Sequence, residues 1–336
     1  MSDVRTVTRP FAHAFAAYGR QNNRVVSVTN DLTRSSEADV FRAELPDRSY
    51  SLGMAEQNLV GVLSGLAREG LEPFYTSFAV FTTRRPYEQI ALNVAYPNLP
   101  VRLMGFLPGI TTPGGVTHQA TDDLGLMRNL PNMTVLELAD ATDVETFWPA
   151  VEALPGPLYC RVPRGEVPRL FTQPFELDRV RSLSAGEDLT VLSIGAAVSH
   201  ASRAVEMLRS TGMGVAHLVV STLKPFSDEE VLRSIARSGR VITVENHLVA
   251  GGLGTAVAEV VAESGLNATL RRVGIADTFT HGGSPDYLFG YYGIDTAGII
   301  QAARALLANP LDGIDLERQE AGRHPPGLGA SSSEGL

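Results

Sequence analysis

The segment LGMAEQNLVGVLSGLARE, residues 52–69, decides the fold of the chain. Apolar residues recur in it at three- and four-residue spacing, which predicts a core-facing helix over residues 54–69 that buries Leu59, Val60, Leu63 and Leu66. A strand-like segment precedes this helix, so Glu56 lies near the first helical turn. A carboxylate there is ordinarily a favourable helix-terminal charge worth about 0.3–1 kcal/mol. Taken alone, Glu56 indicates no more than that.

Outward from this helix, short apolar runs alternate with segments of helical period. Such alternation predicts parallel sheets covered by helices, and hence an α/β fold. A helix over residues 143–154, with Thr142 and Glu145 at capping-box spacing, is part of the pattern. The predicted buried strands are residues 25–28, 101–106, 134–138, 158–162, 189–194, 215–220 and 241–244.

The chain divides into two parallel-type α/β domains. The first is expected over residues 1–165 and the second, smaller one over residues 187–308. Between them, residues 166–186 lack clear periodicity and have the prolines of a linker. The segment 309–336 is rich in Gly, Ser, Pro and charge, and we expect it to be a disordered tail.

Composition excludes several classes of function. The 336 residues carry a formal charge of −9 without a Lys/Arg run, so nucleic acid is not an expected partner. A stretch long and apolar enough to span a membrane is not found, nor is a signal peptide. The single cysteine, Cys160, excludes an internal disulfide and a zinc site of paired thiolates. We expect a cytoplasmic protein that binds a small molecule.

Two further segments are candidates for chemistry. In PFYTSFAVF, residues 73–81, Phe78 and Phe81 are three apart and could present two rings to a flat ligand, although such pairs are usually core aromatics. In GITTPGGVTHQ, residues 109–119, a Gly-rich loop ends in His118, which could move protons. A lone loop histidine is more often solvated or structural, so each signal is weak alone.

The order and spacing of these three elements resemble the transketolase family, whose enzymes use thiamine diphosphate. The resemblance covers the pyrimidine-binding domain and continues through the family's C-terminal domain, over about 300 residues. In the second half it rests on TLKPF at 222–226, VENH at 244–247, GGLG at 251–254 and ADTF at 276–279.

The resemblance assigns a role to each candidate. Glu56 matches the glutamate that hydrogen-bonds N1′ of the cofactor's aminopyrimidine and thereby activates it. Phe78 and Phe81 match the positions that stack on the pyrimidine, and Asp31 matches an acidic residue near the cofactor. His118 matches a histidine that contacts substrate oxygens and assists proton transfer. Glu56 and His118 are thus the expected catalytic pair.

The family's diphosphate-binding domain, with the GDG segment that holds Mg²⁺, would precede these elements. Only some ten residues precede them here, and the sequence contains no GDG. A diphosphate needs a metal and a cluster of donors. The resemblance therefore implies a separate diphosphate-binding subunit, an α2β2 heterotetramer and Mg²⁺ ligands on that partner. We expect none on this chain.

Some residues depart from the family pattern. Gly114 replaces an aspartate that helps recognise a sugar hydroxyl, and Phe106 replaces a histidine that helps bind sugar phosphate. A third stacking ring is missing, because Arg84 stands where a tyrosine is expected. Ser35 and Arg164 match a serine and an arginine that bind substrate phosphate in the family. Arg161, three residues from Arg164, is a second candidate for that arginine. Arg9 could match an N-terminal arginine of the same group, but its spacing is one residue off.

The resemblance favours a transketolase of carbohydrate metabolism, which moves a two-carbon ketol unit from a ketose, phosphorylated or not, to an aldehyde. One alternative is the β subunit of a 2-oxoacid dehydrogenase or a ligase like deoxyxylulose-phosphate synthase. Another is a scaffold subunit without chemistry. His247 and His281 lie in family-like segments of the C-terminal domain, whose role in the family is mainly dimer contact, so we expect no catalytic role for them.

Overall fold

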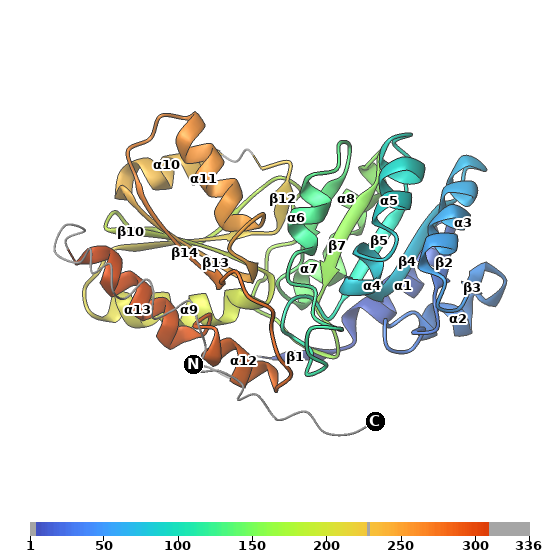
Figure 1. Cartoon of the computed structure of the whole chain (residues 1–336), viewed down its shortest axis with the longest axis horizontal. Coiled ribbons are helices and arrows are strands. Elements are labelled where there is room, and N and C mark those ends of the chain that lie inside the picture. Colours follow the sequence, from blue (N-terminus) through green and yellow to red (C-terminus); the bar gives the residue numbers. More distant parts are fainter. Residues whose placement is uncertain (1–4, 227–228, 309–336) are drawn as a thin grey trace, which may run out of the picture.

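The largest sheet is built mainly from the first half of the chain. In this computed structural model, residues 5–226 and 229–308 are described. The sheet has seven strands, which lie on the right in Figure 1. Neighbouring strands pair in parallel except at β12, which joins β6 antiparallel. The spatial order is β12 (Thr222–Lys224), β6 (Thr134–Glu137), β7 (Leu158–Val162), β5 (Arg102–Phe106), β4 (Glu72–Phe78), β2 (Val25–Thr29) and β3 (Ser49–Ser51).

Helices cover both faces of this sheet, and the predicted helix at 54–69 is confirmed as α3 (Glu56–Arg68). Leu59, Val60 and Leu63 are fully buried, and each such burial is worth about 1.5–3 kcal/mol. The other elements of this half are α1 (Pro10–Gln21), α2 (Asp39–Glu44), η1 (Pro46–Arg48), α4 (Ala79–Thr83), α5 (Tyr87–Gln89), η2 (Ile90–Ala95), α6 (Asp123–Arg128), α7 (Ala141–Thr146) and α8 (Trp148–Ala153).

The predicted helix at 143–154 is instead the two short helices α7 and α8. The capping residue is Asp140, whose side chain accepts a hydrogen bond from the Asp143 backbone N–H at 2.8 Å. The prediction of a Thr142–Glu145 capping box was wrong, because both side chains bind elsewhere. Thr142 donates to the carbonyl of Phe171, and Glu145 pairs with Arg169.

The second half of the chain forms a five-stranded sheet. Its order is β14 (Thr269–Ile275), β13 (Arg240–Leu248), β10 (Leu189–Ile194), β11 (Val215–Val220) and β9 (Arg181–Ser184). Figure 1 places α10 (Glu229–Ser238) and α11 (Leu253–Glu263) on one face of this sheet. The other face carries η3 (Gly195–Ala197), α9 (Val198–Ser210), α12 (Pro285–Tyr291) and α13 (Thr296–Leu307).

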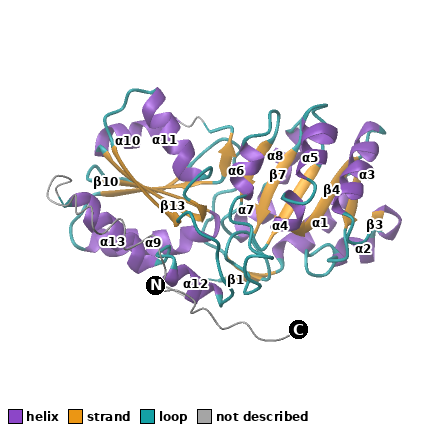
Figure 2. Ribbon diagram, viewed as in Figure 1, coloured by secondary structure: helices purple, strands orange, loops and turns teal. Residues whose placement is uncertain are grey.

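The two units share structure where they meet. Strand β12 comes from the second half but extends the sheet of the first, and one hydrophobic cluster runs from α3 and α6 into α10 and α11. The expected linker contains β8 (Glu166–Pro168), which pairs with β1 (Thr6–Thr8), and the whole of β9. In Figure 2 the orange sheets stand side by side between layers of purple helices. The predicted fold of two α/β units is confirmed.

The expected tail at 309–336 lies outside the described residues, so that prediction stays open. Within the described ranges, none of the helices combines the length and the apolar character needed to cross a membrane.

Candidate active site

Glu56 begins helix α3, just past the carboxyl end of strand β3. Its side chain is only 5% exposed, and its backbone N–H group is among those that start the helix, where the helix dipole favours an anion. The carboxylate forms an ion pair with Arg85, with 2.6 Å between Oε1 and Nη1. Glu56 is therefore a buried anion that faces a planar group.

The two predicted phenylalanines lie next to this carboxylate. Strand β4 ends at Phe78, and the chain turns directly into α4, which carries Phe81. The two rings are stacked, with centroids 6.0 Å apart and an interplanar angle of 26°. Arg85 also reaches this pair, because its guanidinium carbon lies 4.1 Å from the centroid of the Phe81 ring. Arg85 thus contacts Glu56 and Phe81 together.

His118 packs against the same group of side chains. Its loop runs from the end of β5 to α6, and its ring lies 5.4 Å from the Phe81 centroid and 6.4 Å from that of Phe78, edge-on to both. Thr117 Oγ1 is 2.8 Å from His118 Nδ1. The ends of neighbouring parallel strands therefore bring together segments that lie tens of residues apart, as expected for a ligand site of an α/β sheet.

Asp31 follows β2 at the same edge of the sheet and is exposed. Asp31 and Glu56 both act electrostatically on Tyr75, a fully buried residue of β4. Burial raises the pKa of the Tyr75 hydroxyl most, and the charges of Glu56 and Asp31 raise it further. Asp31 thus lies within electrostatic range of the candidate site.

The predicted phosphate-binding residues surround a carboxylate that the sequence did not single out. Glu37, 1% exposed, accepts hydrogen bonds from the backbone of Gly165 at 2.8 Å and of Ala12 at 3.4 Å. Burial raises the pKa of Glu37, while these bonds and the charges of Arg9 and Arg164 oppose the shift. Ser35 is two residues away. Glu37 thereby joins the three segments that carry these predicted residues.

Arg161 and Arg164 are both candidates to match one phosphate-binding arginine of the family, and the structure distinguishes them by burial. Arg161 is fully buried and donates to Asp123 and Glu137, so its charge is already paired. Arg164 is exposed. Of the two, Arg164 is the residue that can meet a substrate.

Arg84 has a different role from the tyrosine expected at its position. Its Nε donates to both oxygens of Asp122, at 2.9 and 3.1 Å. Asp122 is at the end of the loop that carries His118, so this ion pair ties that loop to the end of α4. Nothing in the sequence pattern indicates the pair, because its members are 38 residues apart.

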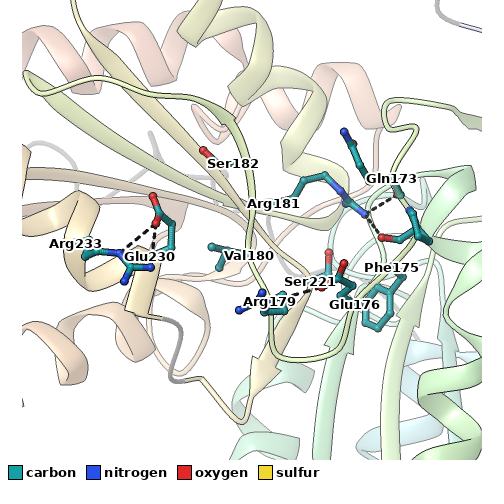
Figure 3. Close-up of a pocket in the computed structure, with 11 residues that line it drawn as sticks. Gln173, Phe175, Glu176, Arg179, Val180, Arg181, Ser182, Ser221, Glu230 and Arg233 are labelled. Carbon is teal, nitrogen blue, oxygen red and sulfur yellow. Dashed lines mark hydrogen bonds and ion pairs between the residues drawn. The ribbon is translucent and has the colours of Figure 1, made fainter.

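Clusters suited to a metal ion, with three or more His, Cys, Asp or Glu side chains, are not found within the described ranges. A cavity of about 470 Å³ lies at the linker, where β9 contributes Arg181 and α10 contributes Arg233 to its lining (Figure 3). Its lining contains none of the predicted site residues. Its arginines are paired with carboxylates, Arg181 with Asp143 and Arg233 with Glu229.

These features define the chain as an α/β protein in which a buried carboxylate, two stacked rings and a histidine gather at one edge of a parallel sheet. Residues 4–169 match the family described as transketolase, pyrimidine binding domain, and residues 178–299 match the transketolase C-terminal domain. The chain belongs to the transketolase family. The predicted family and enzyme class, a transketolase-type transferase, are thereby confirmed, and the family implies thiamine diphosphate as cofactor.

Several relatives match this chain over most of its length. A transketolase family protein of Sinorhizobium fredii, y4mN, is 40% identical over 89% of this chain and 88% of its own. A 6-deoxy-6-sulfo-D-fructose transketolase subunit of a Clostridium species is 39% identical, covering 85% of this chain and 89% of that subunit. An apulose-4-phosphate transketolase subunit of Phocaeicola vulgatus is 32% identical, with 88% and 95% covered.

Solved structures agree with these relatives. One is described as a split gene transketolase, an inactive β4 tetramer. It superposes with a TM-score of 0.82 at 35% identity, over 89% of this chain and 97% of its own. Full-length transketolases, such as that of Campylobacter jejuni, share the fold at 16% identity with a TM-score of 0.75, and this chain spans 47% of that one. The comparisons support the prediction of a small transketolase subunit.

The residues present suit an aminopyrimidine. Arg85, a planar group that bears N–H donors, already lies over the Phe81 ring and donates to Glu56. A cofactor ring that places an N–H at the carboxylate and a flat face on the phenylalanines makes the same two contacts. The side chains of Glu56, Phe78 and Phe81 therefore fit the pyrimidine end of thiamine diphosphate.

Proposed function

We propose that this chain is the small subunit of a split, thiamine-diphosphate-dependent transketolase. The enzyme transfers a two-carbon ketol unit from a ketose to an aldehyde and is active only with a separate diphosphate-binding subunit. The observation that carries the proposal is the meeting of the Glu56 carboxylate, the Phe78 and Phe81 rings and His118 at one edge of a parallel sheet.

Within this proposal, Glu56 accepts a hydrogen bond from the pyrimidine of the cofactor and holds a proton at its ring nitrogen. When bound, thiamine diphosphate supplies the nucleophilic carbon that attacks a ketose carbonyl. Phe78 and Phe81 present the apolar surface against which the pyrimidine packs, and Asp31 adds negative charge nearby. Arg85 leaves the carboxylate when the cofactor arrives.

His118 is the residue proposed to contact substrate oxygens. It is partly exposed, packs edge-on against Phe81 and has a hydroxyl partner at Nδ1. This arrangement leaves Nε2 free to face substrate, where an imidazole nitrogen can donate or accept a proton. Thr117 fixes the orientation of the ring.

The diphosphate and Mg²⁺ are proposed to bind to a partner subunit. Two considerations support this. Mg²⁺ prefers oxygen ligands in an octahedral arrangement, and the site described here offers a single buried carboxylate already committed to N–H donors. Two relatives are also named as transketolase subunits, and a similar chain alone forms an inactive tetramer. We propose an α2β2 assembly in the cytoplasm.

The substrates are proposed to be sugars of carbohydrate metabolism that differ from those of full-length transketolases. Phe106 is fully buried within β5, so that position offers no hydrogen bond to a phosphate. A Cβ atom at Gly114 would lie 2.8 Å from the Cβ of His118, so the loop conformation excludes the aspartate that is usual there. Ser35 and Arg164 remain as candidates to bind an anionic end of the substrate.

The test is to produce this chain with candidate subunits that carry the GDG segment, then titrate thiamine diphosphate with Mg²⁺ by calorimetry. Binding only in the assembled complex, followed by ketol transfer, is the expected result. Tight binding by this chain alone would overturn the split arrangement. Release of CO₂ from a 2-oxoacid would favour the ligase or dehydrogenase alternative, and a complex active without Glu56 would favour the scaffold.

A further inference from the structure

The loop that carries His118 is held mainly by the other domain of the chain. We define the His118 loop as residues 108–122, between β5 and α6. At its base the N–H of Gly109 donates to the carbonyl of Ala120 at 2.8 Å. The residue that meets this base from the C-terminal domain is Asn246, on β13, which is fully buried.

Asn246 binds the loop backbone through both ends of its amide. Oδ1 accepts a hydrogen bond from the N–H of Ile110 at 3.0 Å, and Nδ2 donates to the carbonyl of Pro108 at 3.1 Å. Gly109 between them has φ of +55°, and a Cβ there would lie 2.2 Å from Oδ1 of Asn246. Any side chain at residue 109 would collide with the Asn246 amide, so glycine is required there. The loop backbone and strand β13 therefore pack in direct contact at this point.

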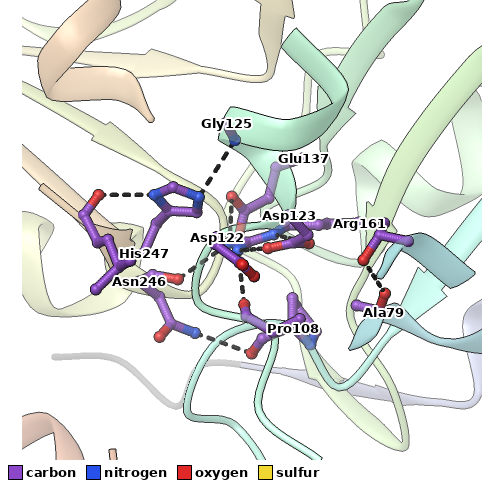
Figure 4. A network of polar contacts seen from close by, with 12 residues as sticks. Ala79, Pro108, Asp122, Asp123, Gly125, Glu137, Arg161, Asn246 and His247 are labelled. Atoms are coloured by element: carbon purple, nitrogen blue, oxygen red, sulfur yellow. Dashed lines mark hydrogen bonds and ion pairs between the residues drawn. The ribbon is translucent and has the colours of Figure 1, made fainter. Parts of the chain in front are cut away.

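A buried arginine links this contact to the far end of the loop. Arg161 donates to the backbone carbonyl of Asn246 and to that of Ala120, both at 3.1 Å. Its remaining donors bind Asp123 and Glu137, as Figure 4 shows. Arg161 thus holds the backbone of Asn246 and the end of the His118 loop through one buried, ion-paired side chain.

Two more contacts from the C-terminal domain hold the loop near its histidine. Gln119, the next residue after His118, donates to the carbonyl of His281 at 3.1 Å. The N–H of Leu248 donates to the carbonyl of Thr121 at 2.8 Å. His247 accepts from the N–H of Gly125, at the start of α6. His247 and His281, for which the sequence analysis expected no catalytic role, thus contact the loop and α6 within this chain.

We infer that Asn246 is a positioning residue for catalysis, which sets the place of His118 from the C-terminal domain. The inference rests on the proposed role of His118. Removing the amide leaves two buried backbone groups of the loop without partners, and such groups are costly to leave unpaired. The loop then shifts or loosens, and a displacement of about 1 Å can slow turnover on the order of 100-fold.

The test is a double-mutant cycle in the assembled enzyme with Asn246→Ala, His118→Ala and the two combined. We expect Asn246→Ala to lower kcat about 10- to 100-fold, with the affinity for thiamine diphosphate within about twofold of the parent. In the His118→Ala background the same change should have little further effect, since groups that act together are not additive. An equal loss in both backgrounds would overturn the inference.

Hydrogen exchange supplies a readout that is independent of turnover. Amides of residues 109–119 should exchange faster in Asn246→Ala, and unchanged exchange would contradict the inference. Thr190→Val is the matched control, because Thr190 is buried on the neighbouring strand and binds Ser234 and Ser238 instead of the loop. If Asn246→Ala does not assemble, Asn246→Asp keeps the size and one acceptor while losing the donor to Pro108. Full turnover by His118→Ala alone would count against the proposed function, whereas the exchange result would still decide the role of Asn246.

Discussion

The carboxylate of Glu56 and the guanidinium of Arg85 form an ion pair in which the arginine also covers the Phe81 ring. The two residues differ in exposure: the Glu56 side chain is 5% exposed and that of Arg85 is 48% exposed. The anion is thus fixed in the protein while its partner can move into solvent. Arg85 therefore occupies the place proposed for the pyrimidine and can leave it.

Replacing Arg85 with glutamine should tighten cofactor binding to the assembled enzyme. The cofactor then displaces no ion pair, and we expect its dissociation constant to fall about 3- to 10-fold, in line with about 1 kcal/mol for a partly exposed pair. Calorimetry on the complex measures this. Arg233→Gln, which breaks an exposed pair on α10, is the control. Weaker binding by Arg85→Gln would instead mean that Arg85 contacts the bound cofactor.

Replacing Glu56 with glutamine should abolish most of the turnover. Glutamine keeps the size of the side chain but cannot hold a proton at the pyrimidine, so we expect kcat to fall about 10²- to 10⁴-fold. Initial rates with saturating cofactor measure the loss. Glu88→Gln, which replaces a carboxylate on α5 outside the site, should behave as the parent. Unchanged turnover in Glu56→Gln would leave the scaffold alternative standing.

Local signals predicted the elements that carry the candidate site, whereas the roles of its residues came only from the resemblance to a family. Glu56 begins a helix whose apolar period is plain in the sequence, and Phe78 and Phe81 lie at a strand end, so their placement follows from short-range patterns. The buried strands were predicted for the same reason, because each is an apolar run bounded by polar residues.

Long-range polar pairs could not be predicted. Arg85 and Glu56 are 29 residues apart, and Asn246 is 136 residues from Ile110. An arginine or asparagine at such positions could equally be solvated at the surface, and no periodic pattern in the sequence distinguishes a solvated side chain from one in a long-range pair. Glu37 also escaped notice, since a buried carboxylate that binds backbone N–H groups is defined by the packing around it. The capping at Asp140 was missed because a neighbouring Thr142 gave the usual spacing.

Introducing aspartate at Gly114 should not restore the sugar-hydroxyl contact of full-length transketolases. A Cβ at this position would lie 2.8 Å from the His118 Cβ, so the loop must move and carry the histidine with it. We expect kcat to fall about tenfold or more for every sugar tested. A panel of ketose donors measures this. Gly65→Asp, on α3 with nothing within 4 Å of its Cβ and no positive φ, controls for the added charge, and higher kcat/KM in Gly114→Asp would contradict the steric argument.

Replacing Arg102 with methionine should destabilise the first domain. Arg102 is 2% exposed, and it donates to Glu72 at 2.9 Å and to the carbonyls of Leu154 and Val151. Removing one partner of a buried pair leaves the other charge uncompensated, which costs about 3–5 kcal/mol. Urea unfolding measures the loss. Adding Glu72→Gln should recover part of it, and Arg233→Met, at an exposed pair, should change stability by less than about 1 kcal/mol. A loss from Arg102→Met no larger than that of Arg233→Met would contradict the prediction.

Replacing His217 with glutamine should remove part of the pH dependence of stability. Burial lowers the pKa of His217 to about 4, below its ordinary value of 6.5. Between these values the unfolded chain binds a proton that the folded chain does not, so the free energy of unfolding falls as the solution is acidified, by about 2 kcal/mol at pH 5. Glutamine can keep the bond to Ser193 but does not titrate.

The His217→Gln variant should therefore be less stable than the parent at pH 7.5 and close to it, or more stable, at pH 5. Other buried groups also titrate, among them His247, whose pKa burial lowers to about 4, and Glu245, whose pKa burial raises to about 7. Acidification raises the free energy of unfolding through Glu245 and lowers it through His247. Both groups are present in the variant and in the parent, so their effects cancel when the two proteins are compared. Urea unfolding at both pH values measures it, with His13→Gln, an exposed histidine, as the control. A difference between variant and parent that is the same at both pH values would show that His217 does not contribute to acid sensitivity.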